Sequence, residues 1–318
     1  MAVKKNIIVF GGFGFIGSNI IEALLNTNLF NVVVFEFKGV TSKFADRVSV
    51  YYGDFNNEED LAEVFENNKI DIVVHLVSTT VPATSNDNVE YDVNSNLIGT
   101  IRLLNIMMQH NVLKIVFLSS GGTVYGEISE PKASEDHPTY PISSHGIVKL
   151  SIEKYLYLYH RLHNLDYLIL RVSNPYGPYH SSDKQGFINV VIRKILRNEK
   201  VVVWGDGTIV RDFIYVKDLA NIISRLLELN LYNQIINVGS GKGYSINQIL
   251  EYIAENHPGT VIEYKPSRIY DIQKIILDTK KLRSIDDIQL TDIRQGINQT
   301  YQWCKADLEE MKRAALSL

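Results

Sequence analysis

The N-terminal segment constrains the fold most, because a strand, a glycine-rich turn and a helix follow one another directly. Residues 6–10 read Asn-Ile-Ile-Val-Phe, residues 11–17 read Gly-Gly-Phe-Gly-Phe-Ile-Gly, and residues 18–25 have the pattern of an amphipathic helix. Glycines at such a turn let the backbone approach a pyrophosphate and let the helix pack closely on the strand. The helix N-terminus adds amide donors for the phosphates. The segment therefore predicts a dinucleotide-binding site, made by Gly11, Gly14, Phe15, Ile16 and Gly17.

The second predicted strand, residues 31–37, indicates which dinucleotide binds. It carries Glu36 nineteen residues after Gly17. A carboxylate there accepts hydrogen bonds from the adenosine ribose hydroxyls and repels a 2′-phosphate. The sequence therefore predicts NAD as the cofactor. The nearby Lys38 is expected to weaken the preference for NAD over NADP. The alternative is a solvated carboxylate at the end of a strand.

The composition excludes several other classes of protein. The 318 residues are 45% hydrophobic and 21% charged, with a formal net charge of −4 and no basic cluster, so neither nucleic acid nor a membrane surface is expected as a partner. The single cysteine, Cys304, excludes an internal disulfide and predicts a cytoplasmic location. The first apolar run breaks at Gly11, which is too early for a signal peptide or a membrane span. Histidines and acids do not cluster at ligand spacing, so no metal site is predicted.

Residues 115–149 form the second segment of the chain that suggests a functional site. The apolar run 115–118 predicts a buried parallel strand, and it stops at residues 119–126, Ser-Ser-Gly-Gly-Thr-Val-Tyr-Gly. The carboxyl end of such a strand is where open α/β sheets place their ligands. Lys149 follows His145 by four residues, one helical turn, so both side chains can point at one site.

These segments together resemble the core of the extended short-chain dehydrogenase/reductase family, the nucleotide-sugar epimerases and dehydratases. In that family a Ser or Thr after this strand works with a Tyr-x-x-x-Lys helix. The tyrosine exchanges a proton with the sugar, and the lysine lowers the tyrosine pKa and holds the nicotinamide ribose. Here the hydroxyl position falls on Gly121 and the tyrosine position on His145. The resemblance implies a catalytic group made of His145 and Lys149 with the nearby hydroxyls of Ser120 and Thr123.

The resemblance also assigns the rest of the cofactor site. Asp54 and Phe55, after the predicted strand 48–52, would hold the adenine. The segment Leu76-Val77-Ser78 would lie against the nicotinamide side, with valine in place of the usual alanine. Asn96, at the start of a long predicted helix, would brace the loops near the cofactor. Ser119 would contact the cofactor at the end of its strand.

A second group of residues is implied to bind the nucleotide sugar. Asn174, in Asn-Pro-Tyr-Gly-Pro, would meet the sugar diphosphate, and Val202 and Trp204 would pack on the nucleobase. Arg211 and Arg268 would grip the diphosphate, because a guanidinium donates to paired phosphate oxygens. Asp271 would contact the ribose or orient Arg268. For either arginine alone, a surface salt bridge is the alternative.

The fold implied is α/β, a doubly wound parallel (Rossmann) sheet with a second, smaller C-terminal domain. Residues 1–172 plus 214–240 would form the NAD-binding domain, and residues 173–213 plus 241–318 the nucleotide-sugar-binding domain. The helices near Asn96 and over residues 147–163 carry more apolar residues than one core face requires. This excess predicts a homodimer through these helices.

The reaction class follows from positions 122 and 123. The dehydratases of the family carry Asp-Glu where this chain has Gly122-Thr123, and its decarboxylases also need an acid there. The resemblance therefore implies an NAD-dependent 4-epimerase that acts on a UDP- or dTDP-hexose by transient oxidation at C4. Two alternatives stay open: a 4-keto-sugar reductase, and a protein that binds NAD and a nucleotide sugar with impaired catalysis, because His145 replaces the proton-transfer group itself.

Overall fold

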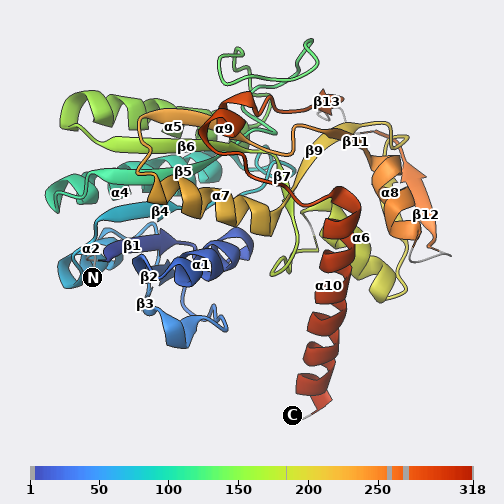
Figure 1. The fold of residues 1–318 in the computed structure, drawn as a ribbon, viewed down its shortest axis with the longest axis horizontal. Helices are drawn as coiled ribbons and strands as arrows, with labels where there is room; N and C mark the ends of the chain where they lie inside the picture. Colours follow the sequence, from blue (N-terminus) through green and yellow to red (C-terminus); the bar gives the residue numbers. More distant parts are fainter. Residues whose placement is uncertain (1–3, 184, 256–259, 268–271, 317–318) are drawn as a thin grey trace.

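The computed structural model describes residues 4–183, 185–255, 260–267 and 272–316. Its centre is a seven-stranded sheet in the order β10-β6-β5-β4-β1-β2-β3, in which every pairing is parallel (Figure 1). The strands are β1 (Lys5–Phe10), β2 (Phe30–Glu36), β3 (Ser49–Tyr52), β4 (Ile72–His75), β5 (Lys114–Ser120), β6 (Asp166–Val172) and β10 (Gln234–Val238). The chain winds outward from β1 to β3, then returns to β4 on the other side of β1. This reversal confirms the predicted doubly wound fold and places a switch point beside β1.

Two helical layers cover the sheet, because successive strand residues face opposite sides. Ile7 and Val9 pack in one cluster with α1 (Phe15–Thr27) and α7 (Val216–Glu228). Ile8 and Phe10 pack in the other cluster with α2 (Glu58–Asn67), α4 (Gly99–Gln109) and α5 (Ser144–His163). Burial on both faces explains why these strands are almost entirely apolar.

The smaller C-terminal part lies at one end of the large sheet, beside the carboxyl ends of the strands of that sheet (Figure 1). Its own core joins two short sheets to three helices. The strands are β7 (Asn174–Tyr176), β8 (Val201–Trp204), β9 (Val210–Tyr215), β11 (Gly243–Ser245), β12 (Ile262–Lys265) and β13 (Lys274–Ile275), and the helices are α6 (Phe187–Leu196), α8 (Ile246–Ala254) and α10 (Ile293–Leu316). A short helix, α9 (Lys280–Ile285), packs near β10. The chain enters this part after β6 and returns through α7 and β10 to the large sheet.

Two local expectations differ from the structure. Residues 18–25 are not amphipathic in the folded protein, since Ser18 and Asn19 are buried along with the apolar residues. Helix α7 and the segment near Pro178 cover the side that was expected to face solvent, and Asn19 Nδ2 donates to the Pro178 carbonyl at 3.0 Å.

The helix expected to open at Asn94 instead begins with α3 (Val89–Asp92). It continues through a π-helical segment, Val93–Ile98, into α4. Among the residues that the structure describes, no helix has the length and apolarity needed to cross a bilayer.

Candidate active site

The glycine turn after β1 is shaped by its backbone. Gly11 has φ of +75°, which favours a residue without a Cβ. A Cβ on Gly17 would collide with the carbonyl oxygens of Gly11 and Gly12, so only glycine fits where α1 packs on β1. Gly14 precedes the helix and has no side chain to cap it. The first amides of α1, at Phe15, Ile16 and Gly17, are therefore available to a phosphate, and the site fits a dinucleotide pyrophosphate.

Glu36 has a role at the turn that the sequence did not indicate. Its Oε2 accepts a hydrogen bond from the Phe13 amide at 2.9 Å, and its Oε1 accepts one from Phe37 at 3.0 Å. The carboxylate thus fixes the glycine turn to the end of β2. Each oxygen retains a lone pair for a ribose hydroxyl, so the predicted contact with the adenosine ribose stays compatible with the geometry.

The other predicted cofactor residues lie at the same edge of the sheet. Asp54 Oδ1 accepts from the Asn56 amide at 2.8 Å, while the Phe55 ring is buried and stacks on His75 with centroids 5.1 Å apart. Val77 lies directly beside Gly11. Phe55 therefore belongs mainly to the hydrophobic core below the ends of the strands. Its ring has little exposed surface with which to contact an adenine.

The loop after Val77 is tied to the π-helical segment. Ser78 Oγ donates to the Thr80 carbonyl at 3.0 Å, and Asn96 Oδ1 accepts from the Thr79 amide at 2.9 Å. Leu76 continues from β4, with its amide donating to Phe10 at 3.1 Å. Asn96 thus holds the loop by contacts within the protein.

A corner between β5 and the start of α5 brings the predicted catalytic residues together. Ser143 caps α5 by accepting from the Gly146 amide, and His145 follows it with 8% of its surface exposed. His145 Nδ1 lies 3.5 Å from Thr123 Oγ1. Lys149 is buried and donates to the Leu118 carbonyl at 3.0 Å. The corner thus brings together an imidazole and an ammonium of α5 and a hydroxyl from the turn after β5.

Burial sets the charge states in this corner. Burial and then the charge of Lys149 lower the pKa of His145, Asp92 opposes them, and the resulting pKa is about 4. Burial also lowers the pKa of Lys149 to about 8, against the effect of Asp92 and Glu153. His145 is therefore neutral near pH 7, which is the form that accepts a proton.

The structure gives a steric reason for the glycine at position 121. A Cβ there would lie 2.6 Å from Leu277 Cδ1 and 3.0 Å from the Arg171 carbonyl oxygen. Leu277, from the C-terminal part, fills the space that a hydroxyl residue would need. Two residues earlier, Ser119 Oγ donates to Glu153 at 2.5 Å, so its hydroxyl is engaged within the protein. Ser120, one residue on, is partly exposed at the strand end.

Three buried charged residues near the corner were missed in the sequence analysis. Glu153 pairs with Arg171 at 2.7 Å, and both lie beneath Ser119. Asp92 has no exposed surface and accepts from Asn96 Nδ2 at 2.8 Å. The available signal was helical spacing: Asp92 lies four residues before Asn96, and Glu153 four after Lys149.

The predicted substrate residues line the second part of the molecule. Asn174 Nδ2 donates to the Asp212 carbonyl at 2.9 Å, and Arg211 Nη1 donates to the Val210 carbonyl at 3.0 Å. Val202 is partly buried on β8, whereas Trp204 is 42% exposed at its end. Arg268 and Asp271 lie outside the described residues.

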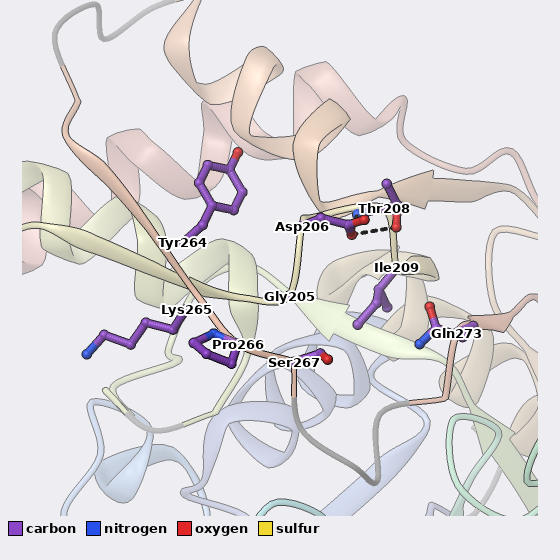
Figure 2. A pocket seen from close by; sticks show the side chains of 9 residues that line it. All are labelled: Gly205, Asp206, Thr208, Ile209, Tyr264, Lys265, Pro266, Ser267 and Gln273. Carbon is purple, nitrogen blue, oxygen red and sulfur yellow. Dashed lines mark hydrogen bonds between the residues drawn. The ribbon is translucent and has the colours of Figure 1, made fainter.

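A cavity of about 640 Å³ opens at Gly205, the residue that follows Trp204 in the chain (Figure 2). The turn after β8 forms one side of it, and the segment after β12 faces that turn. Its lining residues are Gly205, Asp206, Thr208, Ile209, Tyr264, Lys265, Pro266, Ser267 and Gln273. A cavity with hydroxyl, amide and aromatic groups at its wall has the size and chemistry to take a small polar ligand.

Comparison with known proteins identifies the arrangement. The profile of the NAD dependent epimerase/dehydratase family matches residues 7–239. A UDP-glucose 4-epimerase from Halalkalibacterium halodurans is 32% identical over 301 residues, which are 88% of this chain and 89% of that protein. The family's cofactor is the NAD that was predicted from the glycine turn and Glu36.

Two solved structures share the fold over nearly the whole chain. The UDP-glucose 4-epimerase of Thermus thermophilus in complex with NAD has a TM-score of 0.89 at 29% identity, covering 94% of this chain and 99% of that one. The UDP-glucose 4-epimerase of Thermotoga maritima with UDP-glucose has a TM-score of 0.88 at 30% identity, covering 95% and 99%.

Proposed function

The chain belongs to the NAD dependent epimerase/dehydratase family, and on that premise we propose that it is a nucleotide-sugar 4-epimerase that acts on a UDP-hexose. The observation that carries the proposal is the corner where Thr123, His145 and Lys149 lie together without a carboxylate at positions 122 and 123. Loss of a sugar hydroxyl needs an acid to protonate it. Epimerisation needs one group that takes up a proton and returns it.

The cofactor half of the proposal rests on the glycine turn. NAD, when bound, supplies reversible hydride transfer at C4. The amides at the start of α1 would hold its pyrophosphate, Glu36 would meet the adenosine ribose, and Lys149 would hold the nicotinamide ribose. Lys149 is supported in this role by its fixed position against the Leu118 carbonyl.

The proton step would run through Thr123. The C4 hydroxyl proton passes to Thr123 Oγ1 while the Thr123 hydroxyl proton passes to His145 Nδ1. The C4–H bond breaks in the same step and the hydrogen leaves with its electron pair as hydride, for which bound NAD would be the acceptor, so C4 becomes a carbonyl carbon. After the keto sugar rotates, the hydride would return to the opposite face of C4 as the two proton transfers reverse. The distance of 3.5 Å between Thr123 Oγ1 and His145 Nδ1 supports this relay, which offsets the shorter reach of imidazole compared with phenol.

The sugar nucleotide would occupy the C-terminal part. Arg211, with Arg268, would bind the diphosphate, and Asn174 would meet it from the turn after β6. Val202 and Trp204 would pack on the base beside the cavity of about 640 Å³. The partly exposed Trp204 ring supports this assignment, because a tryptophan face open to solvent is suited to stacking on a nucleobase.

The proposal is tested by turnover together with the nucleotides that copurify. We expect purified protein to contain tightly held NAD and to interconvert a UDP-hexose with its C4 epimer without added cofactor. Dependence on added NAD(P)H with a 4-keto sugar would instead establish the reductase. Bound NAD with no turnover of any UDP- or dTDP-hexose, by the parent or by His145→Tyr, would establish the binding protein and overturn the epimerase.

The diphosphate assignment has its own test. Removing one partner of a desolvated charge pair costs about 2–5 kcal/mol, so Arg211→Ala should weaken UDP-sugar binding strongly and leave NAD binding nearly unchanged. Arg225→Ala is the matched control, because Arg225 forms exposed ion pairs with Glu228 and Asp286. Unchanged UDP-sugar binding in Arg211→Ala, measured by calorimetry, would remove Arg211 from the site.

We also propose a homodimer through α5 and the helix that contains Asn96. Apolar side chains remain exposed along α5, namely Ile147, Tyr155, Tyr157, Leu158 and Leu162. Light scattering at micromolar concentration should give the mass of two chains. We further propose a cytoplasmic location, on the ground that Cys304, the single cysteine, is a free thiol.

A further inference from the structure

We propose that Asp92 is a positioning residue for proton transfer at position 145, where its buried carboxylate fixes the start of α5 and offsets the positive charge that forms on the imidazole. The inference rests on the proposed function, since it concerns the protonation of His145 during turnover. It assigns a role to a residue that the motifs of the sequence do not include.

The contacts of Asp92 place its charge beside the corner. It ends α3 and has no exposed surface. Its Oδ2 accepts from Ser144 Oγ at 2.6 Å, and Ser144 immediately precedes His145. Its Oδ1 accepts from Thr80 Oγ1 at 2.6 Å and from Asn96 Nδ2 at 2.8 Å. These three donors are neutral, so they hold the carboxylate in place without cancelling its charge.

Two charges act on His145 directly, Lys149 on α5 itself and Asp92 on α3. Glu153, also on α5, acts on Lys149, and Lys149 acts in turn on the neutral His75 of β4. Glu153 is paired with Arg171 at 2.7 Å, which compensates most of its charge. Asp92 is therefore the carboxylate whose field acts on both His145 and Lys149 with least compensation.

The replacement of tyrosine by histidine reverses the effect of a nearby charge on proton uptake by residue 145. A tyrosine base reacts as an anion and becomes neutral when it takes up the proton, so a lysine stabilises its reactive form. A histidine base reacts as a neutral ring and becomes a cation, so Lys149 opposes proton uptake. A carboxylate has the opposite effects: it hinders formation of a phenolate and favours an imidazolium. Asp92 therefore assists catalysis only when residue 145 is histidine.

This reversal gives a test in two backgrounds. Asp92→Asn keeps the size of the side chain and an acceptor oxygen while it removes the charge. In the parent we expect it to reduce kcat at pH 7 by about tenfold, because a neighbouring charge shifts a pKa by about one unit or more. In His145→Tyr we expect Asp92→Asn to leave kcat at pH 7 unchanged or to raise it. Glu90→Gln is the control, since Glu90 lies exposed on the same helix.

A titration separates this inference from the proposed function. In His145→Tyr, the introduced phenol can be titrated without any substrate as the difference in ultraviolet absorbance between this variant and the parent, since both contain the same 18 other tyrosines. Adding Asp92→Asn should lower the pKa of that phenol by about one unit, whereas Glu90→Gln should not change it. If no nucleotide sugar is turned over, the proposed function fails but the titration still tests Asp92.

Two results would overturn the inference. One is an equal loss of kcat in both backgrounds, which would show a purely structural role. The other is an unchanged phenol pKa in a folded Asp92→Asn protein, as judged by thermal unfolding. Should Asp92→Asn not fold, Asp92→Ser offers a smaller neutral side chain for the same two measurements.

Discussion

The glycine turn after β1 and the corner between β5 and α5 lie at the same edge of the sheet but are built in different ways. At the turn, backbone geometry decides which residues fit: Gly11 has a positive φ, and a Cβ on Gly17 would collide with the carbonyl oxygens of Gly11 and Gly12. At the corner, side chains decide: Leu277 fills the space at Gly121, Ser119 faces Glu153, and His145 stands where a tyrosine was expected.

The difference shows how much substitution each kind of site tolerates. A backbone contact cannot be replaced by another residue type, so the turn retains every glycine that a pyrophosphate site requires. A side-chain site can change when its surroundings compensate. Here the surroundings of His145 include a hydroxyl at Thr123 and a buried carboxylate at Asp92, which come from distant parts of the chain.

The largest effect is expected at the turn. Gly17→Ala places a Cβ against two carbonyl oxygens of a rigid backbone, so we expect NAD binding to weaken by about 10³-fold, roughly 4 kcal/mol. Gly122→Ala is the matched control at the corner, because its Cβ would meet only Ser120 Oγ, at 3.9 Å. Calorimetry with NAD checks both. Comparable NAD affinity in the two variants would mean that the turn is not backbone-limited.

The next effect is expected at the corner. His145→Phe removes the proton acceptor and should reduce kcat by about 10²-fold, the usual scale for a positioned acid–base group. His145→Tyr should raise kcat above that of the parent, because the phenol oxygen reaches farther and Lys149 lies beside it. Steady-state rates with the preferred UDP-hexose provide the measurement. A His145→Phe protein as fast as the parent would show that His145 takes no part.

Cofactor choice tests the turn again with a smaller effect. Glu36 should make NAD bind at least tenfold tighter than NADP, about 1.4 kcal/mol. Glu36→Gln keeps one acceptor oxygen and removes the negative charge, so the discrimination should fall. Equal affinities for NAD and NADP in the parent, by calorimetry, would show that Glu36 does not face the ribose.

The last effect is on stability at acid pH. Burial lowers the pKa of His145 to about 4, and also lowers those of His75 to about 3 and His180 to about 4. An unfolded histidine, with a pKa of about 6.5, takes up its proton first, so stability is full above pH 6.5 and is lost as pH falls toward 4. His145→Tyr should reduce this loss by up to about 1.4 kcal/mol per pH unit. Urea unfolding between pH 7 and 4.5 would reveal the change, and an unaltered slope would contradict the neutral buried imidazole.

The amino-acid sequence by itself determined the doubly wound sheet and the cofactor. Apolar runs such as 6–10 and 115–118 are typical of strands buried on both faces of a parallel sheet, and the glycines of 11–17 act through their own backbone. Both signals are local, since each depends on a few consecutive residues. The NAD dependence of the family confirms the second of them.

Tertiary structure alone decided the chemistry of the corner. The partners that define it are far apart in the chain: Ser144 meets Asp92 across 52 residues, Glu153 meets Ser119 across 34, and Leu277 packs against Gly121. Periodicity and spacing report which side of an element is buried, but not which side chain of another element lies opposite. The electrostatic setting of His145 therefore became visible only once α3, β5 and α5 were placed together, because the field of a charge depends on its distance in space.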